Sequence, residues 1–196
     1  LLRESFRQNP DYVIVGEIRG EEATVMFQGM ASGHPSIGTM HAAGLSTVVK
    51  RLQSPPISIS PSLVEILDVI VTLTHARERG KSARRVKSIE EIEAVEPTGA
   101  ARSSSVFRRI PSKDIFERGE GRYTLNKLAR MKGLSMKDME KELENRERVI
   151  RWMLKEGISH WKEVSKIISQ YHVNPEEVLG DIPAIDEMLD CLKKKK

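Results

Sequence analysis

A short apolar run near the start of the chain constrains its fold most strongly. Residues 12–15 read YVIV, a continuous run rich in β-branched residues, of the kind that is buried on both faces of a parallel sheet. Residues 21–32 follow with helical spacing and end before Gly33, a residue type that often terminates a helix. A buried strand that leads into a helix predicts α/β layering.

The alternation of strands and helices continues to about residue 95. Short strands are predicted at 36–40 and 69–73, and short helices at 46–52 and 61–67. Residues 84–95 place an apolar side chain at every third position, which leaves strand and helix both open. We therefore predict that residues 1–95 form one α/β unit.

Two further regions are predicted after this unit. Residues 96–122 are rich in Gly, Ser, Pro and Arg and contain one strand, 106–110, so we interpret them as a connector with a β-hairpin. Residues 123–196 have helical spacing, and Ser135 with Asp138 has the pattern of a helix cap. This last region is predicted to be small and all-helical.

Two helices are predicted near the end of the chain. The first, near residues 160–171, is predicted to bury Trp161, Val164, Ile167, Ile168 and Tyr171. The second carries apolar residues between 185 and 192 and contains Cys191. A single cysteine excludes internal disulfides, and we interpret Cys191 as a small hydrophobic residue of that helix.

Composition shows neither a membrane span nor a disordered chain. Of the 196 residues, 39% are hydrophobic and 31% are charged, which is typical of a folded globular protein. No stretch approaches the roughly 18 apolar residues of a transmembrane helix. Basic residues cluster between 77 and 87, and such a patch favours anionic partners in general. The first residues lack an initiator methionine and have the pattern of a helix tail, so we expect a downstream piece of a longer protein.

Glu17 is the first candidate for chemistry. It directly follows the buried strand, and ligands of open α/β sheets bind at the carboxyl ends of such strands. A carboxylate there polarises the water that attacks a γ-phosphate, or holds Mg²⁺ through water. Gly16 lets the backbone approach a ligand, and Arg19 supports Glu17 or reaches a phosphate. The alternative is an ordinary surface ion pair between Glu17 and Arg19.

His41 follows the next predicted strand and is expected to face the same cleft as Glu17. An imidazole there senses a terminal phosphate by hydrogen bonding, although a lone histidine is often structural. Arg3 and Arg7 lie one helical turn apart. They either contact a nucleotide across a subunit boundary or only form the solvent-exposed face of a helix. The histidines show no metal-ligand spacing with one another or with Cys191, so no direct metal site is predicted.

Gly80, Lys81 and Ser82 match the second half of a phosphate-loop motif. The first glycine of that motif would fall at His75, and without it a backbone nest around a phosphate is hard to build. The segment also follows the acidic strand, whereas a phosphate loop ordinarily precedes it. We interpret these residues as a basic hairpin turn, and the chain has no phosphate loop ahead of Glu17.

Two segments of the chain resemble a known family. LLRESFRQNPDYVIVGEIRGEEA and GHPSIGTMHAAGLSTVVKRLQSPPISI are similar to the Walker B segment and the histidine box of type II/IV secretion ATPases. The PPI segment and the tail RYTLNKLARMKGLS resemble the archaeal branch more closely. The resemblance implies an α/β fold, the downstream part of a RecA-like P-loop ATPase domain, followed by a small helical region.

The resemblance also implies roles for individual residues. Glu17 matches the Walker B glutamate and His41 the histidine of the histidine box. Arg3, Arg7 and Arg19 fall in the arginine-bearing stretch around the Walker B segment, a looser match. Gly20 stands where many bacterial relatives have aspartate, so a second acidic contact is in question.

The family further implies a hexameric motor that uses ATP and Mg²⁺. Such motors serve type II secretion, type IV pili or the archaellum, contact an inner-membrane platform protein, and lie at the cytoplasmic face of the membrane. No specific nucleic acid is expected as a partner. Because the phosphate loop and aspartate box would lie upstream, the 196-residue chain alone is expected to be inactive.

Two other classes of function stay open. LARMKGLSMKDMEKEL has the helix, glycine turn and capped second helix of a helix-turn-helix DNA-binding module. Its second helix carries more acidic than basic residues, namely Asp138, Glu140, Glu142 and Glu144 against Lys137 and Lys141. The tail is alternatively a non-catalytic module that docks a protein partner.

Overall fold

The computed structural model describes residues 2–78, 81–180 and 182. The predicted last helix and Cys191 lie outside these residues. The chain folds as two compact units, Leu1–Lys127 and Leu128–Lys196. This division does not coincide with the expected boundaries at residues 95 and 122, because the expected connector contributes strands to the first unit. Within the described residues, no helix is both long enough and apolar enough to cross a bilayer.

The first unit begins with a strand–helix–strand arrangement. Helix α1 (Leu2–Arg7) precedes strand β1 (Val13–Val15), which pairs in parallel with strand β2 (Ser36–Gly38). Helix α2 (Glu22–Ala31) forms the crossover between the two strands, as the parallel pairing requires. Gly33 follows this helix with φ +94°, so the predicted glycine stop is confirmed.

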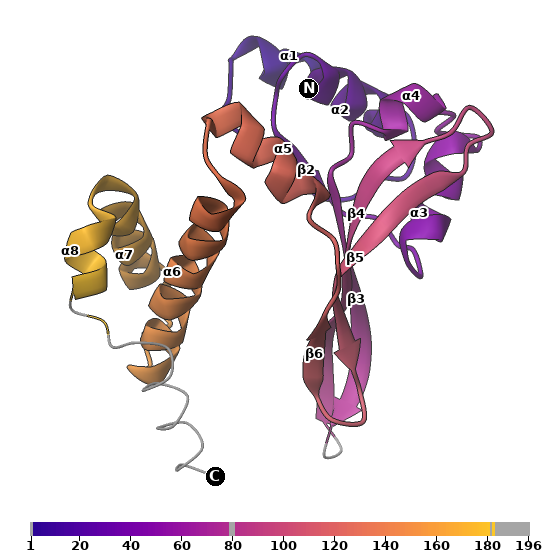
Figure 1. Cartoon of the computed structure of the whole chain (residues 1–196). Helices are drawn as coiled ribbons and strands as arrows, with labels where there is room; N and C mark the ends of the chain where they lie inside the picture. Colours follow the sequence, from indigo (N-terminus) through magenta and orange to yellow (C-terminus); the bar gives the residue numbers. More distant parts are fainter. Residues whose placement is uncertain (1, 79–80, 181, 183–196) are drawn as a thin grey trace. The chain divides into compact units, whose positions relative to one another are not determined.

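A second sheet follows in the same unit (Figure 1). Its four antiparallel strands are adjacent in sequence order: β3 (Val69–Glu78), β4 (Lys81–Val95), β5 (Ala101–Ile110) and β6 (Ile115–Arg118). Two short helices, α3 (Leu45–Gln53) and α4 (Pro61–Val64), connect β2 to this sheet. The predicted hairpin over the basic segment is therefore present, with its tip, 79–80, outside the described residues.

Strand β4 resolves the ambiguity of residues 84–95. Its pairing register skips Lys87 opposite β3 and Glu93 opposite β5, so each of these residues is an extra residue in the strand. A bulge of this kind shifts the alternation of faces by one position. One bulge lies between Val86 and Ile89, and the other lies between Ile92 and Val95. Apolar residues therefore recur at every third position of β4 in place of every second position.

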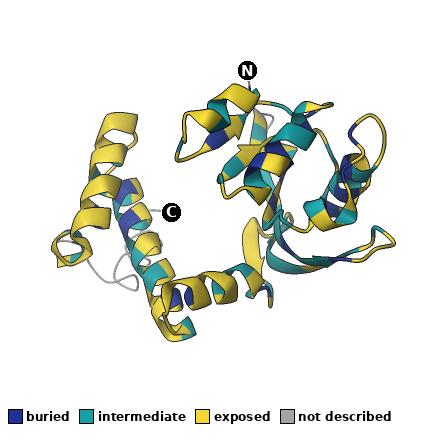
Figure 2. Cartoon of the chain, turned by 90° about the horizontal axis from the view of Figure 1, so that it is seen from above, coloured by how far each residue is buried: buried dark blue, intermediate teal, exposed yellow. Residues whose placement is uncertain are grey.

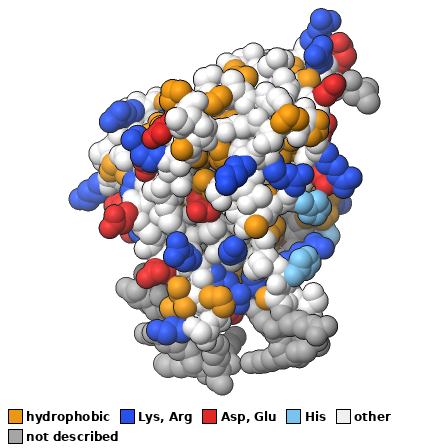
Figure 3. Space-filling model, turned by 90° about the vertical axis from the view of Figure 1, so that its right-hand side faces the viewer, with side chains coloured by type: hydrophobic (Ala, Val, Ile, Leu, Met, Phe, Trp, Pro, Cys, Tyr) orange, Lys and Arg blue, Asp and Glu red, His pale blue; other side chains and the backbone are white. Residues whose placement is uncertain are grey.

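The core of the first unit lies between the helices and the base of the second sheet. Its most deeply buried large side chains are Phe27, Leu52, Val64 and Ile92, all below 3% exposed. Figure 2 shows that the helices carry buried residues on one side and exposed residues on the other. Hydrophobic side chains also reach the surface between Lys and Arg side chains on the face seen in Figure 3.

The sequence predicted that strand β1 is buried on both faces, and this prediction is wrong for one face. Val13 is 6% exposed, but the next residue, Ile14, is 73% exposed. The two residues point to opposite faces of the sheet, and no described element covers the face that carries Ile14. Its register partner on β2, Ile37, is 54% exposed as well.

The second unit is helical. Helix α5 (Tyr123–Lys132) leads into it, and α6 (Met136–Lys155), α7 (Trp161–Val173) and α8 (Pro175–Gly180) follow. The Ser135 cap is confirmed, because Ser135 and Asp138 exchange side-chain and backbone hydrogen bonds in a capping box. Buried side chains of Val149, Met153 and Tyr171 form the core.

The predicted burial of α7 is wrong for two of its five residues. Trp161 is 69% exposed and Ile168 is 43% exposed, whereas Tyr171 is 5% exposed. Among the described residues, the helices packed against α7 cover only a narrow face of it, so the apolar stripe of this helix is wider than the surface that it buries.

Candidate functional site

Glu17 lies just past the carboxyl end of β1, where the sequence placed it. Its Oε1 atom is 2.7 Å from Nε of Arg19, and one third of its side chain is exposed. The hydrogen bond from Arg19, reinforced by the positive charges of Arg19 and Arg51, holds the pKa of Glu17 below its ordinary value. The carboxylate is therefore ionised and still reachable from solvent.

His41 reaches the same oxygen of Glu17. Its Nε2 atom lies 3.4 Å from Glu17 Oε1, and its side chain is 88% exposed. The two residues follow neighbouring parallel strands, whose carboxyl ends meet at one edge of the sheet. The surface pair of Glu17 with Arg19 thus exists, but it belongs to a group of three side chains that also includes the imidazole.

Two hydrogen bonds hold the backbone on which these side chains stand. The Thr39 hydroxyl donates to the carbonyl oxygen of Gly16, which ties the end of β2 to the end of β1. The Arg51 guanidinium donates to the carbonyl oxygen of His41 from the last turn of α3. Sequence reasoning assigned no role to either Thr39 or Arg51, and only the basic last turn of α3 offered a signal.

The loop after Glu17 is held by Glu22 at the start of α2. One oxygen of this carboxylate accepts hydrogen bonds from the backbone amides of Arg19 and Gly20. These amide donors lower the pKa of Glu22, so the carboxylate that holds the loop is ionised. Gly20 stands where the resemblance led us to compare it with an aspartate of bacterial relatives. Its backbone amide donates to Glu22 and so helps to hold this loop.

A small hollow with three basic residues in its lining lies next to Arg19 and the last turn of α3. Its volume is about 230 Å³, and its charged lining residues are Arg19, Lys50 and Arg51. Thr47 and Ser54 add hydroxyl groups to the same lining. We call this feature the basic hollow; its charge favours an anionic ligand such as a phosphate group.

Arg3 and Arg7 are not part of this group. Both lie on α1 with exposed side chains, and Arg7 Nη1 is 3.8 Å from Glu4 Oε2 on the same helix. Helix α1 itself is held in place, because the Phe6 ring covers Gly29 of α2 and meets the His34 ring at a centroid distance of 5.1 Å. A role for the two arginines at a subunit boundary stays a prediction.

Some features of this site, namely an ionised carboxylate and open space beside the backbone, suit a nucleotide with its magnesium ion. Glu17 offers one ionised carboxylate, which suits Mg²⁺ held through water. A Cβ atom added to Gly16 would meet no atom within 4 Å, so the space beside this backbone is open. Among the described residues, no group of three or more His, Cys, Asp or Glu side chains forms a direct metal cage.

Comparison with known proteins matches most of this chain to one protein family. The model of the family described as type II/IV secretion system protein matches residues 1–166. An uncharacterised protein of Methanocaldococcus jannaschii, MJ1287, is 36% identical over 175 residues, which cover 88% of this chain and 65% of that protein.

Two bacterial proteins with functional names also match, over shorter stretches. The conjugal transfer protein TrbB of Rhizobium radiobacter is 32% identical over 95 residues, covering 47% of this chain and 29% of TrbB. The type IV secretion system protein PtlH of Bordetella pertussis is 36% identical over 97 residues, covering 43% of this chain and 28% of PtlH. The chain therefore spans less than two thirds of each of these relatives.

Proposed function

The chain belongs to the type II/IV secretion system protein family, and from this premise we propose that it is the carboxyl-terminal portion of a hexameric ATPase. The proposed motor powers protein secretion or the assembly of a type IV pilus or archaellum. The observation that carries the proposal is the approach of Glu17 and His41 at the ends of two parallel strands, within the segment that matches the family.

Glu17 is proposed to act on the attacking water. Its ionised carboxylate accepts a proton from the water as the water oxygen bonds to the γ-phosphorus of ATP and the bond to the β-phosphate oxygen breaks. The hydrogen bond from Arg19 orients one carboxylate oxygen and leaves the other for the water. When bound, Mg²⁺ would neutralise phosphate charge, held through water near Glu17.

His41 and the basic hollow are proposed to respond to phosphate. His41 shares an oxygen of Glu17, so a hydrogen bond from its imidazole to a terminal phosphate would change that contact. Arg19, Lys50 and Arg51 supply positive charge in the basic hollow. Arg3 and Arg7 are proposed to reach a nucleotide held by a neighbouring subunit of the ring.

The remaining parts of the proposal concern the assembly. The full-length protein forms a ring of six copies and transmits its motion to a platform protein of the inner membrane. It works in the cytoplasm, peripheral to the membrane. We propose that the 196-residue chain on its own is catalytically incomplete, because its sequence carries no phosphate-loop motif ahead of Glu17.

ATP hydrolysis by the full-length gene product tests the proposal. Hydrolysis with ATP and Mg²⁺ is expected in the full-length protein, and Glu17→Gln is expected to reduce the rate at least a hundredfold, because the amide cannot accept the proton. His41→Ala is expected to reduce the rate with a smaller effect on nucleotide binding. Glu65→Gln, a change of an exposed carboxylate at the end of α4, is the matched control and keeps the full rate.

The isolated chain gives the opposite expectation. Residues 1–196 alone are expected to show no ATP hydrolysis above background. If the purified chain hydrolyses ATP and loses this activity in Glu17→Gln, it is not catalytically incomplete. If the full-length protein keeps its rate in Glu17→Gln, the assignment of Glu17 is wrong.

A further inference from the structure

The basic hollow concentrates positive charge at one place on the surface. Its lining contains three cationic side chains, and none of the described residues that line it is acidic. Lys50 and Arg51 come from the last turn of α3, and Arg19 comes from the loop after Glu17. The ammonium group of Lys50 has no hydrogen-bond or ion-pair partner within the part of the chain that the structure describes. The carbonyl end of α3 opposes an anion by only about half an elementary charge, so the three full positive charges dominate.

The size of the basic hollow selects a small ligand. Its volume of about 230 Å³ lies below the roughly 300–1,000 Å³ that is typical of pockets for larger organic ligands. A single phosphate group suits this space better than a whole nucleotide does. Guanidinium groups match the oxygens of a phosphate with a planar fork of N–H donors, and the hydroxyl groups of Thr47 and Ser54 offer further donors.

The two arginines of the hollow also hold the candidate site. Arg19 Nε lies 2.7 Å from Glu17 Oε1, and Arg51 donates to the carbonyl oxygen of His41. The Arg19 side chain is 73% exposed, so little packing holds it in this position. A guanidinium group has one plane and one fork of donors, so an oxyanion in the hollow competes with these contacts. Occupancy of the hollow is thereby coupled to the positions of Glu17 and His41.

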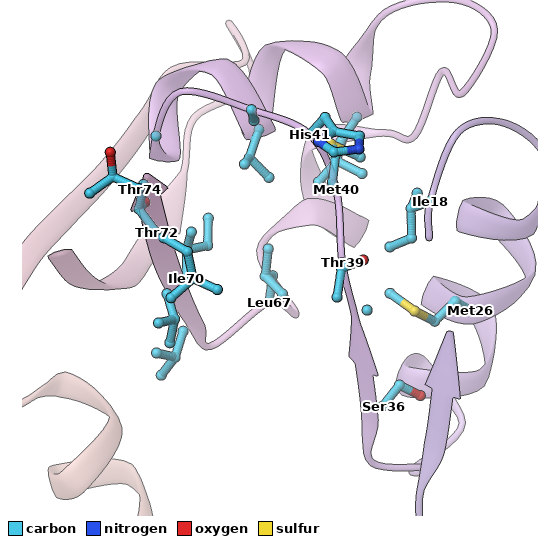
Figure 4. A pocket seen from close by; sticks show the side chains of 18 of the residues that line it. Ile18, Met26, Ser36, Thr39, Met40, His41, Leu67, Ile70, Thr72 and Thr74 are labelled. Carbon is cyan, nitrogen blue, oxygen red and sulfur yellow. The ribbon is translucent and has the colours of Figure 1, made fainter. Parts of the chain in front are cut away.

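The basic hollow is distinct from a larger hollow, of about 590 Å³, that also borders His41. Figure 4 shows one wall of the larger hollow, where Thr39, Met40 and His41 follow one another along the segment after β2. The two hollows share no lining residue. His41 therefore lines one space, while its carbonyl oxygen accepts a hydrogen bond from an arginine that lines the other. An anion in the basic hollow acts on the backbone of His41 without entering the larger hollow.

We propose that the basic hollow binds one free phosphate ion through its three cationic side chains, and that the bound ion draws the two arginines away from Glu17 and from the His41 carbonyl. Binding rests on the charge and size of the hollow. Its consequence for ATP hydrolysis rests on the proposed function: the phosphate that hydrolysis releases loosens the carboxylate that acts on water until the ion departs.

The terminal phosphate of a nucleotide has the same chemistry as the free ion. Neither Glu17 nor His41 lines the basic hollow, so a nucleotide whose γ-phosphate lies at these two residues does not fill it. This separation favours the free ion as the occupant, and the test distinguishes the two sources.

Nuclear magnetic resonance titration of residues 1–196 with sodium phosphate tests the proposal. The amide signals of Thr47, Lys50 and Ser54 and the guanidinium signals of Arg19 and Arg51 are expected to shift and to saturate. Saturation is expected only at millimolar phosphate, because exposed ion pairs are weak. Sodium chloride at the same ionic strength is expected to leave these signals in place, and ADP or ATP at the same concentration is expected to shift them less than phosphate does.

Lys50→Met removes one cation from the hollow. It is expected to weaken phosphate binding about threefold to fivefold, the fold-change that one exposed ion pair supplies. Lys113→Met is the matched control, because Lys113 is an exposed lysine of the same unit that does not line the hollow. Its affinity for phosphate is expected to equal that of the unchanged chain. Amide signals of the core that stay in place in both variants verify the fold.

Glu17→Gln tests the competition for Arg19. The variant removes the negative charge that holds this arginine, so phosphate is expected to bind about threefold more tightly. Glu65→Gln removes the same charge from an exposed carboxylate elsewhere in the unit and is expected to leave the affinity unchanged.

Four results would overturn the proposal. The first is an absence of shifts beyond those caused by chloride, and the second is an equal effect of Lys50→Met and Lys113→Met. The third is an unchanged affinity in Glu17→Gln, since phosphate would then not compete for Arg19. The fourth is a shift with ATP and none with phosphate, which would assign the hollow to a nucleotide. Absence of ATP hydrolysis in the full-length protein leaves these readouts unchanged, so the two proposals fail separately.

Discussion

His41 Nε2 lies 3.4 Å from Glu17 Oε1, although the two residues belong to separate strand ends. The Thr39 hydroxyl donates to the Gly16 carbonyl immediately behind this pair, so the backbone of both strands is fixed where the side chains meet. The approach of carboxylate and imidazole is thus built into the ends of β1 and β2.

Removal of the Arg19 side-chain charge is expected to raise the pKa of Glu17. In Arg19→Met the carboxylate loses its hydrogen bond and its nearest positive charge, which are the causes of its lowered pKa. The stability that this pair contributes is present above the unfolded-state pKa of Glu17 and is lost as pH falls through the lower folded-state value.

Carboxyl-carbon chemical shifts followed over an acid titration measure this change. Lys50→Met is the matched control, because Lys50 lines the same basic hollow but is not among the groups that shift the pKa of Glu17. An unaltered Glu17 titration in Arg19→Met would contradict the assigned cause.

Gly29→Ala is expected to destabilise the docking of α1 on α2. A Cβ atom at position 29 would lie 2.1 Å from the Phe6 ring, so the ring must move. Overpacking of this kind costs about 1–3 kcal/mol. Native-state hydrogen exchange of α2 amides measures the loss of stability. Gly33→Ala is not a suitable control, because an alanine at the positive φ of Gly33, +94°, would add backbone strain of its own.

Gln28→Ala supplies a neutral comparison for this helix, because Gln28 is exposed. It is expected to change the stability of α2 by less than about 0.5 kcal/mol. Equal stabilities of Gly29→Ala and Gln28→Ala would show that Phe6 moves without cost.

Glu91→Ala is expected to weaken the junction between the second sheet and α5. The Glu91 carboxylate is 3% exposed and accepts hydrogen bonds from the backbone amides of Tyr123, at 2.8 Å, and Thr124, at 3.2 Å. Its removal leaves two helix-terminal donors without this partner and is expected to cost about 1–3 kcal/mol.

The loss is measured as faster amide exchange at residues 123–127. Glu91→Gln keeps one carbonyl oxygen and is expected to give an intermediate effect. If Glu91→Gln and Glu91→Ala match the unchanged protein, water replaces the carboxylate and the junction is held by other contacts.

Tyr171 is expected to ionise only in strongly alkaline solution. Burial, together with the hydrogen bond from its hydroxyl to Glu142 at 2.8 Å, raises the pKa of Tyr171 to about 12. The folded state therefore keeps the phenol neutral when the unfolded chain, with a phenol pKa of about 10, already ionises. The associated stability is full below about pH 10 and is lost as pH rises toward 12.

Ultraviolet absorbance of the phenolate measures this titration. The late step is expected to disappear in Tyr171→Phe, and the helical unit of that variant is expected to depend less on alkaline pH. A late step that persists in Tyr171→Phe would belong to another tyrosine.

Much of the local structure was predictable because its causes are local. Ser135 and Asp138 satisfy backbone groups of their own helix, and Gly33 relieves a left-handed backbone position, so neither depends on distant residues. The meeting of Glu17 and His41 was predictable too, since strand ends in parallel order share one edge of a sheet.

Other features were not predictable because they depend on packing between distant segments. Arg51 reaches the His41 carbonyl only because the chain brings the last turn of α3 back to the segment that follows β2. The bulges at Lys87 and Glu93 arise from pairing with two different strands, so the spacing within β4 alone left strand and helix open. Trp161 looked like a core residue and is 69% exposed, because burial requires a neighbouring surface that a helix pattern does not reveal.

By itself the sequence determined most of the order of strands and helices up to residue 73, the helix ends at Gly33 and Ser135, and the two side chains that meet after the parallel strands. Propensity, capping and strand order depend on residues close together in the chain, so they can be read without coordinates. Only the tertiary structure decided which segments cover which surface, and that Ile14 and Leu73 lie exposed within the described residues. Burial and edge pairing depend on which segments are present to cover a surface, and no local pattern contains that information.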